Sequence, residues 1–215
     1  MWRKYKMNKL ELKKILYYLI HNSDNFLFSR VKEIEIIKQN KNFRYLDNNE
    51  IVDCIISFYF ENTIVNLKAK KKNVKKINGI TAKIKYLLTY QLDKDLVNKD
   101  FCKKAFLFLS TEGKLSQILD YFFKMSSHMW YLAGDTSTDI NYYSKRLILT
   151  SVYSKIFIKL LTFSNYTQDL IEKDVDSSLL SVKKFNDIKN KICSSDILSI
   201  LKKFQTENKS QGRGF

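Results

Sequence analysis

Apolar residues recur along most of the chain at intervals of three and four, the spacing that places them on one face of an α-helix. Strand-like alternation and turn dipeptides are rare. Asn48 and Asn49 precede one of the clearest stripes and are candidate helix caps. The pattern therefore predicts an all-α bundle of about nine to ten helices. The main stripes lie within 10–20, 50–59, 77–88, 97–108, 115–130 and 140–163.

A polar segment separates the last two of these stripes. Gly134 follows the apolar run and suits the left-handed position that ends many helices. Asp135, Ser137, Thr138 and Asp139 follow it, and their side chains can accept hydrogen bonds from the free N–H groups of the next helix. We expect these residues to fix a helix junction rather than to touch a substrate.

The same pattern divides the chain into four segments. Residues 1–48 are expected to form an N-terminal helical subdomain that resembles a helix-turn-helix, and residues 49–192 a ligand-binding helical bundle. Residues 193–207 are expected to form a C-terminal amphipathic helix, and residues 208–215 a disordered tail.

The expected C-terminal helix has an apolar face. Ile197, Ile200, Leu201 and Phe204 are spaced i, i+3, i+4 and i+7, and Lys202 and Lys203 flank them. Such a face can lie in a membrane interface, with the lysines near anionic headgroups. It can also pack on the bundle or on a second subunit.

Charge favours an acidic partner surface. The formal net charge is +16, from 38 Lys and Arg against 22 Asp and Glu, although only five of the basic residues are Arg. The richness in Lys, Ile and Asn is also what AT-rich codons produce. Residues 68–76 contain six Lys, which fit a solvated helix end or loop, or a contact with anionic lipid or nucleic acid.

The sequence offers little catalytic chemistry. It contains two histidines, His21 and His128, and three widely spaced cysteines with no CxxC pair. No phosphate-binding, nucleophile-elbow or metal-ligand motif occurs, and no apolar run reaches the roughly 18 residues of a membrane span. We therefore expect a binding protein without enzymatic activity, metal or cofactor. Trp130 is either an exposed anchor for a partner or a core residue.

Residues 129–146, which read MWYLAGDTSTDINYYSKR, resemble the signature of the Coq-nine family, the accessory proteins of ubiquinone biosynthesis. That signature runs roughly Trp, two variable residues, Ala-Gly-Asp-x-Ser-Thr-Asp-Phe-Asn-x-Tyr-Ser/Thr-Lys/Arg-Arg. Weaker similarity covers about residues 50–165. Ile140 replaces the usual Phe and Tyr142 the usual Trp, and the family's residues beyond Ser164 are absent or altered.

The resemblance implies a lipid-binding protein with a TetR/FadR-like helical fold, often a homodimer. Family members bind isoprenoid quinone intermediates at the membrane and present them to a ring hydroxylase, without catalysing chemistry themselves. Met129, Trp130 and Tyr131 would then contact the hydroxylase, and no specific nucleic acid would be bound.

The expected location follows from the same resemblance. It is peripheral on the cytoplasmic face of the inner membrane in a bacterium, or on the matrix side of the mitochondrial inner membrane in a eukaryote. The alternative function is a TetR-like DNA-binding transcriptional regulator, which would use the N-terminal subdomain.

Overall fold

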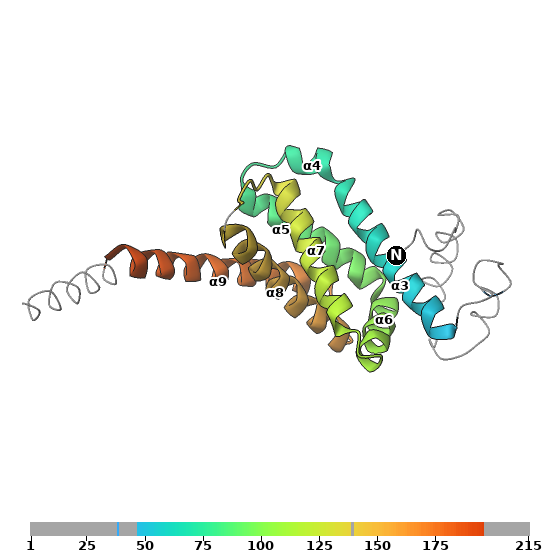
Figure 1. Ribbon diagram of the computed structural model, residues 1–215. Coiled ribbons are helices and arrows are strands. Elements are labelled where there is room, and N and C mark those ends of the chain that lie inside the picture. Colours follow the sequence, from blue (N-terminus) through green and yellow to red (C-terminus); the bar gives the residue numbers. More distant parts are fainter. Residues whose placement is uncertain (1–37, 39–46, 139, 196–215) are drawn as a thin grey trace, which may run out of the picture. The chain divides into compact units, whose positions relative to one another are not determined.

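The computed structural model describes residues 38, 47–138 and 140–195, and these residues form helices and no strand (Figure 1). The prediction of an all-α protein is thus confirmed for the described residues, while the count of nine to ten helices stays a prediction. The helices are α3 (Asn48–Lys68), α4 (Lys71–Lys75), α5 (Ile80–Val97), α6 (Lys99–Thr111), α7 (Leu115–Ala133), α8 (Ile140–Thr162) and α9 (Gln168–Ser195).

The chain forms two compact units, of which the first extends to Val175 and the second begins at Asp176. The described core belongs to the first unit. The described part of the second unit is the remainder of α9, residues 176–195. The four predicted segments have other boundaries, and they stay predictions.

Helix α3 begins with a reciprocal cap. The Asp47 side chain accepts a hydrogen bond from the Glu50 backbone N–H at 2.7 Å, and the Glu50 carboxylate accepts one from the Asp47 N–H at 3.1 Å. This capping box satisfies two N–H groups that the helix leaves unpaired. The predicted cap at Asn48 or Asn49 was wrong by one or two residues, because both already lie inside the helix.

Helix α7 is the centre of the first unit. It packs against α3, α4, α5, α6 and α8, because three- and four-residue spacing gives it a broad apolar face. Aromatic rings dominate the middle of this core, and Phe122 contacts Tyr153 and Phe157 edge-on. The buried residues of α7 are Ile118, Tyr121, Phe122, Met125, Ser126, Met129 and Ala133.

Two predicted helix boundaries need correction. Ile77 precedes α5, and Val97 ends that helix, 78% exposed, rather than opening the next one. The chain turns at Asn98, whose side-chain amide donates to the Lys94 carbonyl at 3.0 Å. The predicted polar stretch at 68–76 contains the short helix α4.

Several predicted features lie outside the described residues. They are nearly all of the N-terminal subdomain, Asp139 of the helix junction, the apolar face at 197–204 and the C-terminal tail. No helix that the structure describes is both long and apolar enough to cross a membrane.

Candidate functional site

The buried face of α5 carries a carboxylate in the protein core. Ile84, Leu88, Gln91 and Asp95 follow one another at intervals of four, three and four, so all four lie on the same side of the helix. Leu87 and Leu92 widen that apolar face. Asp95 is 0% exposed, although Asp is among the residues least often fully buried without a partner.

Hydrogen bonds from neutral groups hold this carboxylate. The Tyr153 hydroxyl donates to Asp95 Oδ2 at 2.6 Å, and Gln91 Nε2 donates to Oδ1 at 2.9 Å. The Tyr121 hydroxyl lies 3.3 Å from that of Tyr153, so the network links α5, α7 and α8. No salt bridge to Asp95 occurs within the described residues.

Burial without a cation changes the titration of Asp95. Burial raises the pKa of this carboxyl from 3.8 to about 7, although the hydrogen bonds from Tyr153 and Gln91 favour the charged form. Burial likewise raises the pKa values of the Tyr153 and Tyr121 hydroxyls well above 10.0, so both stay protonated. Near neutral pH the Asp95 carboxyl is therefore protonated and uncharged in part of the molecules.

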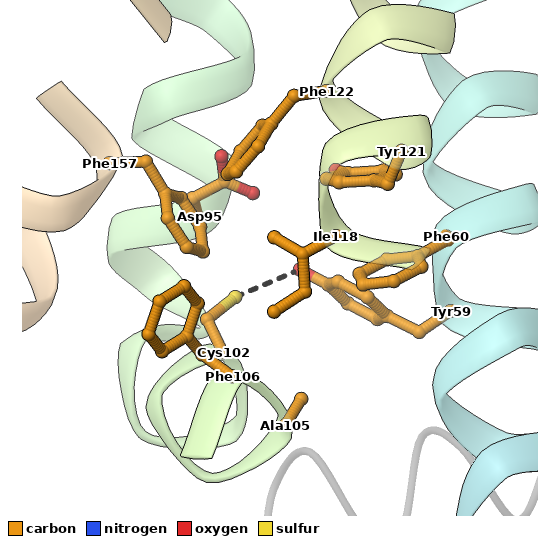
Figure 2. Close-up of a pocket in the computed structure, with 10 residues that line it drawn as sticks. All are labelled: Tyr59, Phe60, Asp95, Cys102, Ala105, Phe106, Ile118, Tyr121, Phe122 and Phe157. Carbon is orange, nitrogen blue, oxygen red and sulfur yellow. Dashed lines mark hydrogen bonds between the residues drawn. The ribbon is translucent and has the colours of Figure 1, made fainter. Parts of the chain in front are cut away.

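Asp95 lines a small aromatic cavity between α3, α5, α6, α7 and α8 (Figure 2). Its volume is about 20 Å³, which is enough for one water-sized molecule. The Tyr59 hydroxyl and the Cys102 thiol face each other across it at 3.5 Å. The lining residues are Tyr59, Phe60, Asp95, Cys102, Ala105, Phe106, Ile118, Tyr121, Phe122 and Phe157.

A larger groove lies on the outer side of the same aromatic wall. The groove opens between α3 and α7 and has a volume of about 390 Å³, within the range of small-ligand sites. Phe60 and Tyr121 line both the groove and the cavity, and their rings stack with centroids 4.0 Å apart.

The sequence analysis did not identify Asp95 or the groove. The sequence did contain a signal for Asp95. Gln91 and Asp95 are polar residues at two positions of α5 where the helical spacing of the apolar stripe predicts apolar residues. The groove has no such signal, because it depends on how α3 and α7 pack.

The second candidate feature is the junction between α7 and α8, where the predicted motif lies. Gly134 has φ 93° and ψ 26°, and its N–H donates to the Tyr131 carbonyl at 3.1 Å. The Asp135 N–H donates to the Trp130 carbonyl at 3.0 Å. This pair of bonds is a Schellman motif, which ends α7 at a residue able to adopt positive φ.

Asp135 binds the beginning of α8 to this junction. Its Oδ1 accepts hydrogen bonds from Lys145 Nζ at 2.8 Å and Ser137 Oγ at 2.6 Å, and its Oδ2 accepts one from Arg146 Nη1 at 3.1 Å. The Arg146 guanidinium lies 3.3 Å from the ring centroid of Tyr142. The side chains of Asp135 and Arg146 are only 3% and 4% exposed, so this ion pair is buried.

The cations determine the charge state of Asp135. Burial alone would raise the pKa of this carboxyl, but the hydrogen bonds from Lys145, Ser137 and Arg146 outweigh it and lower the pKa to about 2. Asp135 is therefore ionised throughout the physiological range, in contrast to Asp95. Thr138, another residue of the predicted motif, is exposed.

The three predicted partner-binding residues lie in different environments. Met129 is 0% exposed, so its side chain belongs to the core and is not available to a partner in this conformation. Trp130 is half-buried; its Nε1 donates to the Lys145 carbonyl at 3.0 Å, and Lys145 Nζ lies 5.5 Å from the ring centroid. Tyr131 is 67% exposed and is the residue of the three best placed for contact.

Within the described ranges, no group of three or more His, Cys, Asp or Glu side chains is arranged to hold a metal ion. Cys54 and Cys102 are free thiols. Burial lowers the pKa of His128, and the charge of Lys68 lowers it further, so its imidazole is more readily neutral than a free one.

Residues 115–186 match the sequence model of the COQ9 family, which is the Coq-nine family whose signature residues 129–146 resemble. No curated protein and no solved structure matches the chain, so the TetR/FadR-like fold stays a prediction. The matched residues include all of α7 and α8, which supply the junction at Asp135 and four of the ten residues that line the aromatic cavity. The match covers about one third of the chain and supports membership of the COQ9 family, which is connected with ubiquinone biosynthesis.

Proposed function

We propose that the protein is a lipid-binding accessory factor of ubiquinone biosynthesis, which holds an isoprenoid quinone intermediate at the membrane and presents it to a ring hydroxylase. The observation that carries the proposal is the COQ9 match over residues 115–186, the segment that supplies Tyr121, one of the two stacked rings shared by groove and cavity. No enzymatic activity of its own is part of the proposal.

The groove between α3 and α7 is the proposed entrance for the ligand. A quinone intermediate has a flat ring and an apolar tail, and the ring can stack against Phe60 or Tyr121 at the floor of the groove. The cavity is too small for such a ring as it stands. Binding would therefore separate the Phe60–Tyr121 pair and admit the ring to the space beside Asp95.

Polar groups beside the cavity suit a quinone head. A neutral Asp95 carboxyl or the Tyr121 hydroxyl can donate a hydrogen bond to a ring carbonyl, and the aromatic walls exclude water from that bond. The isoprenoid tail would remain in the groove and in the bilayer, because each CH₂ moved into water costs about 0.8 kcal/mol.

The hydroxylase contact is proposed to use the exposed part of the junction. Tyr131 is exposed at the end of α7, and Trp130 lies beside it under Lys145. The homodimer and the membrane-binding face at 197–204 belong to the proposal as expectations from the family resemblance.

The function is tested by complementation of a ubiquinone-producing host that lacks its own COQ9-family factor. The wild-type chain is expected to restore ubiquinone and to lower the pool of unhydroxylated intermediate. Tyr131→Ala is expected to lower that restoration about tenfold, because it truncates an exposed aromatic anchor without creating a cavity in the core.

The matched control is Leu119→Ala, which removes an apolar side chain 61% exposed at the opposite end of α7. It is expected to restore ubiquinone as the wild type does. If the wild-type chain is produced in folded form and the intermediate still accumulates, the proposed function is wrong. If Tyr131→Ala and Leu119→Ala behave alike, the contact surface lies elsewhere.

A further inference from the structure

One stretch of the chain carries only positive charge. Between Glu61 and Asp93 the sequence contains eight Lys and no acidic residue. We call the surface formed by these lysines the basic end. It excludes Lys85, which lines a pocket with Asp93 and Glu172, and consists of Lys68, Lys70, Lys71, Lys72, Lys75, Lys76 and Lys83.

Packing gathers these lysines at one place. The short helix α4 joins α3 to α5 and packs against α5 and α7, and it crosses one end of the bundle beside the start of α5 (Figure 1). Lys83 Nζ donates to the Ala133 carbonyl at 3.4 Å, which ties α5 to the last turn of α7. The basic end is therefore next to the α7–α8 junction.

Most of this charge is available to a partner. Lys68, Lys71, Lys72, Lys75 and Lys76 are exposed, and none of them has an ion-pair partner among the described residues. Some lysines in the rest of the bundle, among them Lys114, Lys145 and Lys159, pair with an aspartate. Unpaired like charges repel one another, so their concentration here favours an anionic surface.

Exposed apolar side chains accompany the lysines. Val65 at the end of α3 is 51% exposed, Ile80 at the start of α5 is 47% exposed, and Tyr131 lies at the same end of α7. Aliphatic and tyrosine side chains among lysines are typical of surfaces that lie in a bilayer interface. Nucleic-acid phosphates make no favourable contact with apolar side chains such as Val65 and Ile80. Residues 62–92 also contain no Arg, the residue that most often reads guanine bases.

We propose that the basic end is a membrane-docking surface that binds anionic lipid headgroups through the α4 lysines, with Val65 and Ile80 at the acyl boundary. This surface is separate from the expected face at 197–204. The inference extends the proposed function by giving the bundle an orientation that directs the junction with Tyr131 toward the bilayer. Its test needs neither a quinone nor a hydroxylase, so its failure would be distinct from failure of the proposed function.

The experiment measures sedimentation of the full chain with vesicles of phosphatidylcholine alone, or with about one third phosphatidylserine. The test variant is Lys71→Gln, Lys72→Gln, Lys75→Gln and Lys76→Gln combined. The wild type is expected to bind the anionic vesicles in a salt-sensitive manner. The variant is expected to bind them at least about tenfold more weakly, since it loses four lysines that attract anionic headgroups.

The matched control removes the same charge elsewhere, with Lys103→Gln, Lys104→Gln, Lys155→Gln and Lys173→Gln combined. It is expected to keep binding within about twofold of the wild type. Equal loss in both variants would mean that net charge alone drives binding, and it would overturn the proposal. Wild-type binding to random duplex DNA, with no binding to anionic vesicles at the same salt concentration, would also overturn it.

Discussion

Asp135→Asn is expected to lower the free energy of unfolding by roughly 3 kcal/mol, because it leaves a buried arginine without its anion. Arg146 is 4% exposed, and its Nε already has no hydrogen-bond partner. Besides a neutral amide at position 135, its guanidinium would keep only the Tyr142 carbonyl and ring. Chemical denaturation at pH 7 measures the loss.

The matched control is the same aspartate-to-asparagine change in an exposed ion pair. Asp120 pairs with Lys124 on the outside of α7, where both side chains are more than half exposed. Asp120→Asn is expected to cost less than about 1 kcal/mol, as exposed pairs usually do. Similar losses from the two variants would contradict the account of a buried ion pair at the junction.

Acid provides an independent check on Asp135. Its folded pKa of about 2 lies below the ordinary 3.8, so its stabilisation is present above about pH 4 and is lost as the pH falls through about 2. The stability difference between the wild type and Asp135→Asn should shrink over this interval. A constant difference from pH 6 to pH 2 would show that the carboxylate charge contributes nothing.

Asp95→Asn is expected to stabilise the protein at pH 8 by roughly 2 to 4 kcal/mol. The folded pKa of Asp95 is about 7 against an ordinary 3.8, so the folded state holds a proton that the unfolded state releases. Wild-type stability therefore falls as the pH rises from about 4 to about 7. At about 1.36 kcal/mol per pKa unit the full difference is roughly 4 kcal/mol. Asparagine does not titrate, so its advantage should grow over this range and level off above it.

Tyr153→Phe tests the cause of that titration. The Tyr153 hydroxyl donates to Asp95 and lowers its pKa, so removing it should raise the folded pKa and extend the fall in stability to higher pH. Unfolding midpoints across pH 4–9 for the wild type and both variants give the profiles. If Asp95→Asn keeps the wild-type pH dependence, Asp95 is not the titrating group.

The sequence predicted the helices whose apolar stripes are regular, and it failed where charges and hydroxyls interrupt them. The helix expected over 140–163 is α8, and the segment expected to run to Trp130 is α7. No helix was predicted for 164–187, yet α9 begins at Gln168. The apolar residues there, among them Leu170, Ile171 and Val175, alternate with acidic and serine residues and form no obvious stripe.

The candidate site likewise has one part that could be predicted from the sequence and one part that could not. The junction at Gly134 and Asp135 could be identified because backbone conformation and charge pairing act within a short stretch of chain. Asp95, Phe60 and Tyr121 could not be brought together, because they lie on three helices whose packing depends on the whole core. Likewise, only the three-dimensional structure shows that Met129 is buried, Trp130 is half-buried and Tyr131 is exposed.

The bundle is proposed to hold an isoprenoid quinone intermediate in the groove between α3 and α7. The most direct measurement is mass spectrometry of lipids extracted from the full chain, purified from a ubiquinone-producing host. It compares the wild type with Ser57→Trp, which fills the groove, and with Ser151→Trp on the exposed face of α8. We expect near-stoichiometric isoprenoid quinone species in the wild type and Ser151→Trp, and about tenfold less in Ser57→Trp. A lipid-free wild type, or equal occupancy in the two tryptophan variants, would contradict the claim.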